Sequence, residues 1–229
     1  MQAVILAAGR GTRMGELTEK LPKPLLEVAG KTLLEHKFDA LPDDVDEIIL
    51  IVGYLKEKIQ EHLGDSYKGK KLIYIEQKNI VGGTMDAVLQ AHSVLKGRFF
   101  IMYGDDLYAK EDMKKALSFE DWVVVIQRRE ELGSTASVLV DEHQLITDII
   151  EADSHAGGPG LANTGLYLLD ERLFNYPPVK VKNREELGLP QTILQAIPSI
   201  PIHIVETDFF IAITNPDDIA KAEALLSTR

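Results

Sequence analysis

Short apolar runs, rich in Val and Ile, alternate with amphipathic stretches along the whole chain of 229 residues. This alternation constrains the fold strongly, because buried strands that are separated by helices form a sheet with helices packed on it. The runs predict strands at Ala3–Leu6, Glu47–Val52, Leu72–Ile75, Phe99–Tyr103, Trp122–Ile126, Ser137–Val140, Gly165–Leu169 and Ile202–Val205. The amphipathic stretches predict helices at Thr32–Leu41, Leu55–Leu63, Thr84–Leu95, Glu111–Leu117, Glu185–Ile197 and Pro216–Leu226. The sequence therefore predicts a fold of the α/β class.

The chain shows no internal repeat and no linker, so we predict a single domain over residues 1–229. Between Ser134 and Leu169 the predicted strands follow one another without a helix, which favours an antiparallel insertion beside a parallel sheet. The glycine-rich residues 157–160 are interpreted as a loop inside that insertion. Near the C-terminus, Asn215 is a predicted helix cap and Pro216 occupies the first helical position. We expect a mixed, mostly parallel sheet between layers of helices.

The composition excludes several classes of function. The chain has 25 Lys and Arg against 36 Asp and Glu residues, a net charge of −11, whereas coating a nucleic acid or an anionic membrane requires a basic surface. Its lack of cysteine removes disulfides and thiolate metal sites, and it suits a reducing compartment. The first apolar run, Ala3 to Ala8, is too short for a signal peptide or a membrane span. We expect a cytoplasmic protein that binds neither nucleic acid nor membrane.

A glycine-rich loop follows the first predicted strand directly. Gly9 and Gly11 allow backbone N–H groups to approach an anion closely. Arg10 and Arg13 add positive charge beside that anion, and residues 1–31 carry five basic against three acidic side chains. The glycines do not have the spacing of a dinucleotide-binding loop or of a P-loop. Two interpretations remain, a cradle for phosphate and a tight turn without a ligand.

Two segments, Leu6 to Gly15 and Leu21 to His36, together resemble the signature of the sugar-1-phosphate nucleotidyltransferases. This family includes glucose-1-phosphate thymidylyltransferases and N-acetylglucosamine-1-phosphate uridylyltransferases. The resemblance implies a Rossmann-like three-layer α/β/α fold. It also implies transfer of a nucleoside monophosphate from a nucleoside triphosphate, UTP or dTTP by preference, to a sugar 1-phosphate, with Mg²⁺ as cofactor. The partners are thus small molecules, and no oligomeric state is predicted.

In that family the glycine loop, an arginine and a lysine hold the triphosphate. The residues that correspond by position are Leu6, Ala8, Gly9, Gly11, Thr12, Arg13 and Lys23. Arg13 and Lys23 are also expected to be catalytic, because positive charge there would stabilise negative charge on the transferred phosphoryl group.

A second segment, Glu76 to Ala87, follows a predicted strand and opens a helix. It resembles the turn with which the family reads the nucleobase. The resemblance implies nucleotide-binding roles for Gln77, Gly82, Gly83 and Thr84. The Gln77 amide offers both a donor and an acceptor, which suits the edge of a pyrimidine. The alternative is an ordinary amide in a loop.

The apolar strand that starts at Phe99 ends in two carboxylates, Asp105 and Asp106. Successive side chains on a strand point to opposite faces, so the two carboxylates diverge unless the chain turns. Asp105 matches the family's Gly-Asp motif, in which the aspartate holds Mg²⁺, an ion that prefers oxygen ligands. The alternative is an aspartate that caps a turn.

The family's second metal-binding aspartate would fall on Ala212, which has no ligand atom. We therefore predict Asp208, four residues earlier, as the second metal ligand. The alternative for Asp208 is a solvated acid at the end of a strand.

Four residues are predicted on the side of the sugar phosphate. Glu151 ends the strand Ile146–Ile150, and Asn163 and Thr164 precede another strand. The resemblance implies that these residues bind the sugar and that Gly104 lies beside its phosphate. The alternative is a set of polar residues on the surface.

Two other functions stay open at this point. One is a cytidylyltransferase that acts on a non-sugar phosphate such as choline phosphate or a polyol phosphate. The other is a catalytically silent regulatory module that binds a nucleotide, which the alanine at position 212 motivates.

Overall fold

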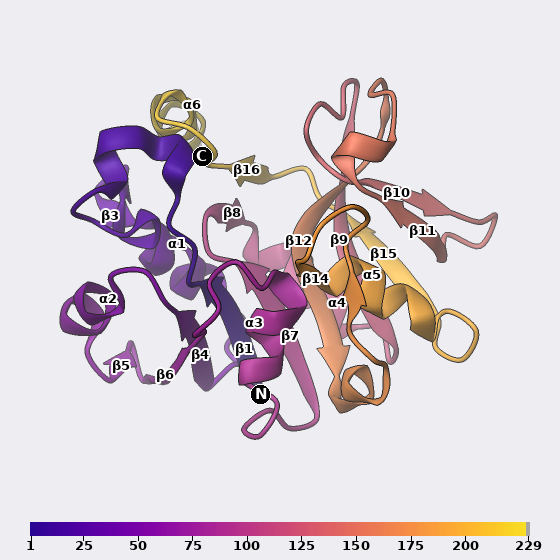
Figure 1. Cartoon of the computed structure of the whole chain (residues 1–229), viewed down its shortest axis with the longest axis horizontal. Coiled ribbons are helices and arrows are strands. Elements are labelled where there is room, and N and C mark those ends of the chain that lie inside the picture. The colour runs from indigo at the N-terminus through magenta and orange to yellow at the C-terminus, as the bar shows by residue number, and fades with distance from the viewer. Residues whose placement is uncertain (228–229) are drawn as a thin grey trace.

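The computed structural model describes residues 1–227. In this part of the chain, ten strands form one central sheet (Figure 1). The strands are β1 (Gln2–Ala7), β4 (Glu47–Val52), β5 (Ser66–Tyr67), β6 (Lys70–Glu76), β7 (Arg98–Tyr103), β9 (Trp122–Arg129), β10 (Ser137–Val140), β11 (Ile146–Ile150), β12 (Gly160–Asp170) and β15 (Ile202–Glu206). Their order is β11-β10-β12-β7-β1-β4-β6-β5, and β9 pairs with both β12 and β15. All the predicted strands are present, with ends that differ by a few residues.

The sheet is mixed and mostly parallel, as predicted. β1 pairs in parallel with β4 and with β7, and β4 pairs in parallel with β6. β12 runs antiparallel to β7, β9 and β10, and β10 pairs antiparallel with β11. Following these pairings, only β5, β11 and β12 oppose the direction of the other strands in the described sheet. The antiparallel insertion predicted between Ser134 and Leu169 is therefore confirmed.

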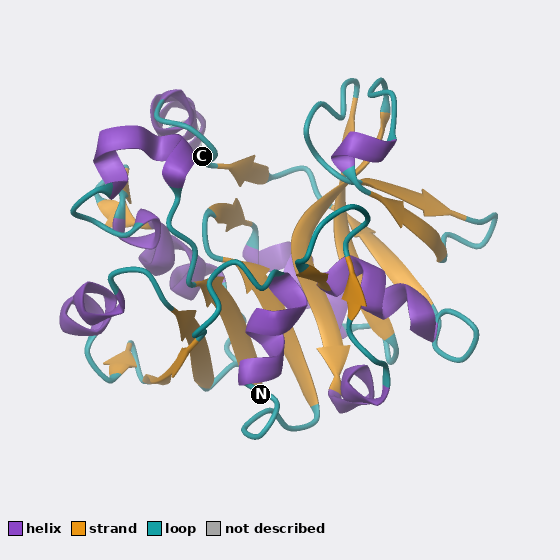
Figure 2. Ribbon diagram, viewed as in Figure 1, coloured by secondary structure: helices purple, strands orange, loops and turns teal. Residues whose placement is uncertain are grey.

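Helices cover both faces of the sheet (Figure 2). They are α1 (Leu33–Ala40), α2 (Lys56–Leu63), α3 (Thr84–Gln90), α4 (Lys110–Leu117), α5 (Leu189–Ile193) and α6 (Asp217–Leu226). On β1, Val4 packs in one core with Val88 of α3, whereas Ile5 packs in a second core with Phe38 of α1. This alternation of neighbouring side chains is why the apolar strands require a helix layer on each side. The predicted three-layer arrangement is confirmed.

The helix predicted over Glu185–Ile197 is shorter than expected. Leu187–Gly188 instead form β14, which pairs with β13 (Val179–Lys180), and the helix begins at Leu189. The Leu187 N–H donates to the Gly82 carbonyl at 2.7 Å, so a tertiary hydrogen bond holds this segment extended. Pro190 lies in the first turn of α5, where its missing N–H costs nothing.

Two other helix ends differ in detail from the prediction. The helix predicted to reach Leu95 ends at Gln90. At the C-terminus, α6 begins at Asp217, one residue after Pro216, and the Asn215 side chain accepts the Asp217 N–H at 3.0 Å. Asn215 thus accepts a backbone N–H at the start of the helix, as predicted, but Pro216 takes the N-cap position and not the first helical position.

A small third core joins the C-terminal segment to the beginning of the chain. It contains Met14, Val28, Ile211 and Ala222 of α6. Nearby, β16 (Phe210–Ala212) pairs antiparallel with β8 (Asp106–Tyr108), and β2 (Glu27–Val28) forms a hairpin with β3 (Lys31–Thr32). This packing places the C-terminal segment against the region after the glycine loop.

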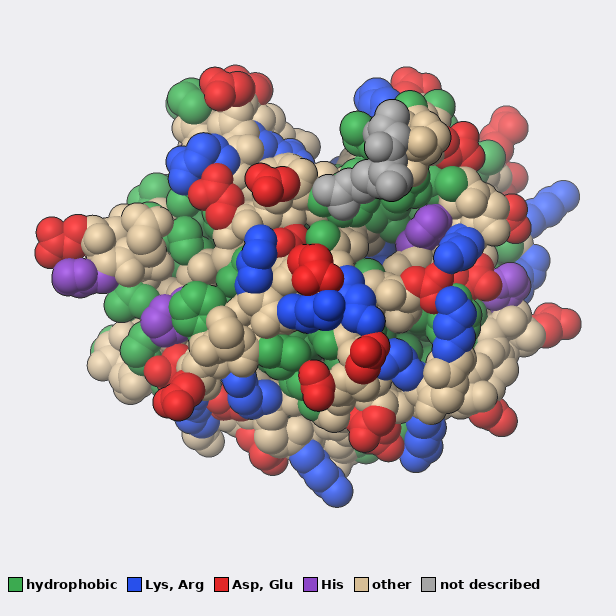
Figure 3. All heavy atoms as spheres, turned by 180° about the vertical axis from the view of Figure 1, so that it is seen from behind, with side chains coloured by type: hydrophobic (Ala, Val, Ile, Leu, Met, Phe, Trp, Pro, Cys, Tyr) green, Lys and Arg blue, Asp and Glu red, His purple; other side chains and the backbone are tan. Residues whose placement is uncertain are grey.

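Acidic and basic side chains lie side by side across the rear face of the molecule (Figure 3). The excess of acidic residues in the sequence is therefore interspersed with basic residues on this face. No helix within residues 1–227 is long and apolar enough to cross a membrane.

Asp39 of α1 ties β3 and the β5–β6 turn to the helix layer. Its carboxylate accepts hydrogen bonds from Lys31 at 2.6 Å, Lys68 at 2.5 Å and the Tyr67 hydroxyl at 3.1 Å. Burial by itself raises the pKa of Asp39, but these hydrogen bonds outweigh burial and lower the pKa to about 2. The folded protein therefore keeps this carboxylate charged at a pH where the unfolded chain protonates it.

We expect Asp39→Asn to lower the free energy of unfolding at pH 7 by about 1–2 kcal/mol, after allowance for the exposed lysines. The difference from the unaltered protein should shrink as the pH falls from about 4 to 2, because the unfolded chain binds the proton first. Urea denaturation at pH 7 and pH 3 measures both values. The exposed Asp44→Asn is the control, and an effect that stays constant with pH would contradict the assignment.

Candidate active site

The carboxyl ends of two neighbouring parallel strands bring the predicted nucleotide loop and the predicted metal ligand together. Leu6 of β1 lies opposite Tyr103 of β7 in the parallel ladder. Just beyond, the Gly104 N–H donates to the Leu6 carbonyl at 2.9 Å. A Cβ atom on Gly104 would lie 2.5 Å from that oxygen, so only glycine allows this approach. Asp105 therefore emerges beside the glycine loop.

A cavity of about 250 Å³ lies between the glycine loop and Asp105. Its lining residues are Leu6, Ala7, Gly9, Gly11, Thr12, Arg13, Lys23, Pro24, Gly104 and Asp105. Six of the seven residues predicted to hold the triphosphate line this cavity, and the seventh, Ala8, lines a larger neighbouring cavity. The structure thus brings the predicted phosphate-binding set together.

Lys23 and Asp105 form an ion pair at the edge of this cavity. The distance from Lys23 Nζ to Asp105 Oδ2 is 2.5 Å. The Lys23 side chain is 7% exposed and the Asp105 side chain 35% exposed. Lys23 begins a short 3₁₀ turn, Lys23–Leu25, which presents its side chain to the cavity. A buried ammonium group needs an anionic partner, and Asp105 provides it in this structure.

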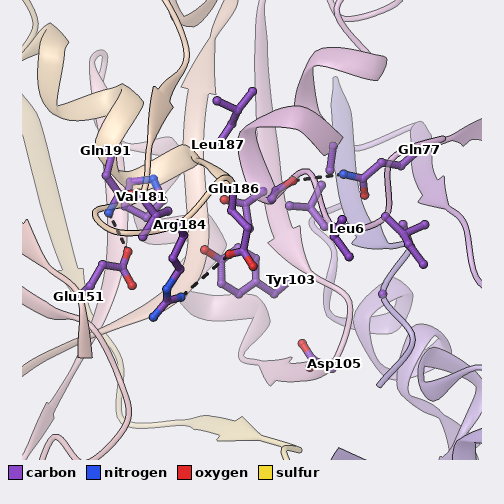
Figure 4. Close-up of a pocket in the computed structure, with 18 of the residues that line it drawn as sticks. Leu6, Gln77, Tyr103, Asp105, Glu151, Val181, Arg184, Glu186, Leu187 and Gln191 are labelled. Atoms are coloured by element: carbon purple, nitrogen blue, oxygen red, sulfur yellow. Dashed lines mark hydrogen bonds and ion pairs between the residues drawn. The ribbon is translucent and has the colours of Figure 1, made fainter. Parts of the chain in front are cut away.

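The larger cavity has a volume of about 600 Å³, which is within the range of small-molecule sites. It shares Leu6, Gly9, Arg13 and Asp105 with the smaller one. One side is formed by Ala8, Gln77, Ile80, Val81, Gly83, Thr84 and Ala87. The other side is formed by Tyr103, Glu151, Val181, Arg184, Glu186, Leu187, Pro190 and Gln191 (Figure 4).

The two adjacent aspartates point into different surroundings. Asp105 lines both cavities, whereas Asp106 is buried in β8. Burial raises the pKa of Asp106, and the negative charge of Asp105 raises it further. Behind Asp106, the fully buried Lys37 of α1 donates a hydrogen bond to the Asp106 carbonyl. Burial lowers the pKa of Lys37, and the Asp106 carboxylate offsets part of that effect. Asp105 is therefore the one of this pair that faces a ligand.

The structure does not bring Asp208 to Asp105. Asp208 is exposed in the turn between β15 and β16, and it lines neither cavity. The β8–β16 ladder explains this placement, because Ala212 lies opposite Asp106 and Phe210 opposite Tyr108. Asp208 is thus beyond the far end of that ladder. Position 212, where the family resemblance implies a ligand, does adjoin the aspartate pair, but it carries only a methyl group.

Asn163 and Thr164 lie in the wall behind the site and line neither cavity. They occupy a bulge in β12, and the register against β9 shifts between Asn163 and Leu166. The Asn163 amide donates to the Tyr167 hydroxyl at 2.7 Å and accepts the Gly165 N–H at 3.1 Å. Both side-chain groups of Asn163 are thus engaged inside the protein, where they hold the bulge. Gly82, also predicted to bind nucleotide, lies just behind Gly83 and is not part of the lining.

Glu151 does line the larger cavity, together with residues that the sequence did not single out. Gln191 donates to Glu151 at 2.7 Å, and Arg184 bonds to Asp153 at 2.8 Å. Figure 4 shows Arg184 close to Glu186 on the same wall. The sequence analysis missed Arg184 and Gln191 because their partners Asp153 and Glu151 lie more than 30 residues away in the chain, and only the fold brings them together. The one available signal in the sequence was Arg184 followed directly by Glu185 and Glu186.

Comparison with known proteins places this chain in a family. Residues 2–200 match the model of the nucleotidyl transferase family. The chain is 32% identical over 99% of its length to the bifunctional protein GlmU of Methanocaldococcus jannaschii, and covers 54% of that protein. It is 31% identical to the UTP–glucose-1-phosphate uridylyltransferase AglF of Haloferax volcanii, over 84% of this chain and 82% of the relative. The chain spans about half the length of the GlmU relatives that it matches.

A solved structure of a putative glucose-1-phosphate thymidylyltransferase from Bacillus anthracis shares the fold. The TM-score is 0.86 at 21% identity, over 98% of this chain and 94% of the other. The fold and the match of residues 2–200 to the family model together define a nucleotidyl transferase. Within that class, the chain belongs to the sugar-1-phosphate nucleotidyltransferase family.

Gly83 gives a direct test of how the start of α3 packs against β14 in the wall of the larger cavity. Its φ is +92°, and a Cβ atom there would lie 2.5 Å from the Leu187 carbonyl oxygen. We expect Gly83→Ala to lower the free energy of unfolding by roughly 1–3 kcal/mol, because both the backbone and the contact with β14 are strained. Urea denaturation measures the change. Gly9→Ala is the matched control, since a Cβ atom there meets nothing within 4 Å in residues 1–227. Equal losses in both variants would contradict this account.

Proposed function

We propose that this chain transfers a nucleoside monophosphate from UTP or dTTP to a sugar 1-phosphate, with release of pyrophosphate and with Mg²⁺ as cofactor. The strongest support is the meeting of Lys23 and Asp105 at the boundary of the two cavities. The smaller cavity has the glycines and cations that suit a triphosphate. The larger cavity has room for a nucleoside on one wall and a sugar on the other.

In the proposed reaction, a phosphate oxygen of the sugar 1-phosphate attacks the α-phosphorus of the triphosphate. The bond from the α-phosphorus to the oxygen that bridges it to the β-phosphorus breaks, and pyrophosphate leaves with that electron pair. The attacking oxygen is already ionised near neutral pH, so no general base is needed. The protein contributes positioning and positive charge. Arg13 and Lys23 are the cations of the lining that face this step.

Asp105 fits a role as a magnesium ligand. It is a hard oxygen donor that lines both cavities. Within residues 1–227, no group of three or more His, Cys, Asp or Glu is placed to hold a metal ion, so phosphate oxygens and water would complete the coordination. When bound, Mg²⁺ supplies positive charge to the phosphates. A triphosphate in the smaller cavity would offer Lys23 another anionic partner, and Asp105 would then be available to hold the ion.

On the opposite wall, the Glu151 carboxylate can accept hydrogen bonds from the sugar phosphate, and the Arg184 guanidinium can donate them. Gln191 holds Glu151 in place by a hydrogen bond of 2.7 Å. Paired acceptors and donors of this kind suit neighbouring sugar hydroxyls.

A pyrophosphate-release assay tests the proposal against its alternatives. UTP, dTTP, CTP and GTP are each combined with sugar 1-phosphates, with choline phosphate and with a polyol phosphate. We expect turnover with UTP or dTTP and a sugar 1-phosphate. Turnover confined to CTP with a non-sugar phosphate would make the chain a cytidylyltransferase. Tight nucleotide binding without turnover of any pair would indicate a regulatory module, in agreement with the alanine at position 212.

Lys23→Ala should lower kcat by about 10²- to 10³-fold, as does the loss of one contact to developing charge in other enzymes. Steady-state pyrophosphate release measures the effect. Lys20→Ala is the control, because Lys20 is an exposed lysine of the same segment. Turnover near that of the unaltered enzyme in the Lys23 variant would remove this residue from the mechanism.

Asp105→Ala should abolish Mg²⁺-dependent pyrophosphate release, because the lining loses its carboxylate beside the phosphates. It should also weaken Mn²⁺ binding in the presence of nucleotide, which paramagnetic resonance measures without turnover. Retention of both properties would place the metal elsewhere.

A further inference from the structure

The Gln77 side chain is held in one orientation by two hydrogen-bond acceptors. Gln77 is 5% exposed and lines the larger cavity. Its Nε2 donates to Asp86 Oδ2 at 2.8 Å and to the Gly83 carbonyl at 3.2 Å. A carboxylate and a carbonyl can only accept, so the amide nitrogen must be the atom that faces them. Both N–H bonds of Gln77 are thereby used within the protein.

The Gln77 amide oxygen is left for a ligand. No donor in residues 1–227 bonds to Oε1, and Figure 4 shows this oxygen turned away from the Gly83 carbonyl. An amide normally presents a donor and an acceptor side by side. In this chain, Gln77 presents an acceptor alone.

The backbone is shaped to let Asp86 reach Gln77. The Asp86 carboxylate lies against Gly82, where a Cβ atom would come within 2.6 Å of it. Asp86 is in the first turn of α3, and its own carbonyl accepts from Gln90 at 3.1 Å. Gly82 therefore has a clear role although it lies outside the cavity lining, because it makes room for the carboxylate that orients Gln77.

We propose that Asp86 is a positioning residue that sets nucleobase preference by keeping Gln77 as a hydrogen-bond acceptor. This inference rests on the proposed function. The one hydrogen-bond donor of a uracil or thymine base is its ring N3–H group, so the Gln77 oxygen meets N3–H. Cytosine in the same pose places a bare ring nitrogen against that oxygen, and two acceptors then face each other without a proton. The site therefore selects UTP and dTTP over CTP.

The expected preference for UTP over CTP is roughly 10- to 100-fold in kcat/KM, the effect of one unpaired buried polar group. Calorimetry with UTP and N3-methyl-UTP measures the same contact as binding, without turnover. The methyl group removes the donor, so we expect binding to weaken by a similar factor. If no triphosphate is turned over, the proposed function fails, but this binding comparison still tests the Gln77 assignment.

Variants of Asp86 test its part in the preference. Asp86→Ala removes one of the two acceptors that hold Nε2, so the amide can turn and the UTP to CTP ratio of kcat/KM should fall towards one. Gly82→Ala displaces the same carboxylate and should lower the ratio as well. Asp86→Asn keeps an acceptor at this place and should retain the ratio. The ratio is internal to each variant, so a general loss of folded protein does not change it.

Two results would overturn the inference. One is an Asp86→Ala variant that keeps the full preference of the unaltered enzyme. The other is equal binding of UTP and N3-methyl-UTP by the unaltered enzyme.

Discussion

The parallel pairing of β1 with β7 is the constraint on which the candidate site depends. The two strands are in register from Gln2 opposite Phe99 to Leu6 opposite Tyr103, so they end at the same level of the sheet. The glycine loop and Asp105 emerge there, and the short contact between Gly104 and the Leu6 carbonyl holds the two chain segments together. Lys23 can reach Asp105 only because both strands stop at this edge. Ligands of open α/β sheets bind at such carboxyl ends for the same reason.

Asp105 and Asp106 are neighbours in the sequence, but their surroundings give the two carboxylates different roles. Asp106 is buried and has a raised pKa, and the buried Lys37 lies behind it. Asp105 lies at the surface of both cavities with the ammonium group of Lys23 beside it. The hydrogen bond from Lys37 to the Asp106 carbonyl joins α1 to β8, whereas the ion pair of Lys23 with Asp105 is accessible to a ligand. Asp106 thus takes part in an interaction that stabilises the fold, and the preceding residue, Asp105, takes part in one that a ligand can reach.

Local patterns in the sequence predicted the strands and the helix layers, and the family resemblance predicted most of the residues that line the smaller cavity. Apolar runs require burial on both faces of a sheet, and glycines beside a strand end allow a close approach by an anion. The sequence was less informative where one tertiary contact outweighs local preference. Leu187 is extended because its N–H bonds to Gly82, although the surrounding residues form a helical pattern. A bulge in β12 turns Asn163 and Thr164 into the wall, and no local sequence pattern predicts this bulge.

The sequence by itself determined the class of fold, the glycine loop and the candidate cations beside it, since neighbouring residues specify strands and loops. Strand alternation indicated that Asp105 and Asp106 diverge, and the resemblance to the family's Gly-Asp motif favoured Asp105. Only the tertiary structure decided that Asp208 lies away from Asp105, that Gln191 bonds to Glu151 and that Arg184 lines the same cavity. It also decided which atom of Gln77 is free, because the partners of that amide come from the helix that follows it. The physical reason is that a side chain's orientation depends on the hydrogen-bonding groups that the fold places around it.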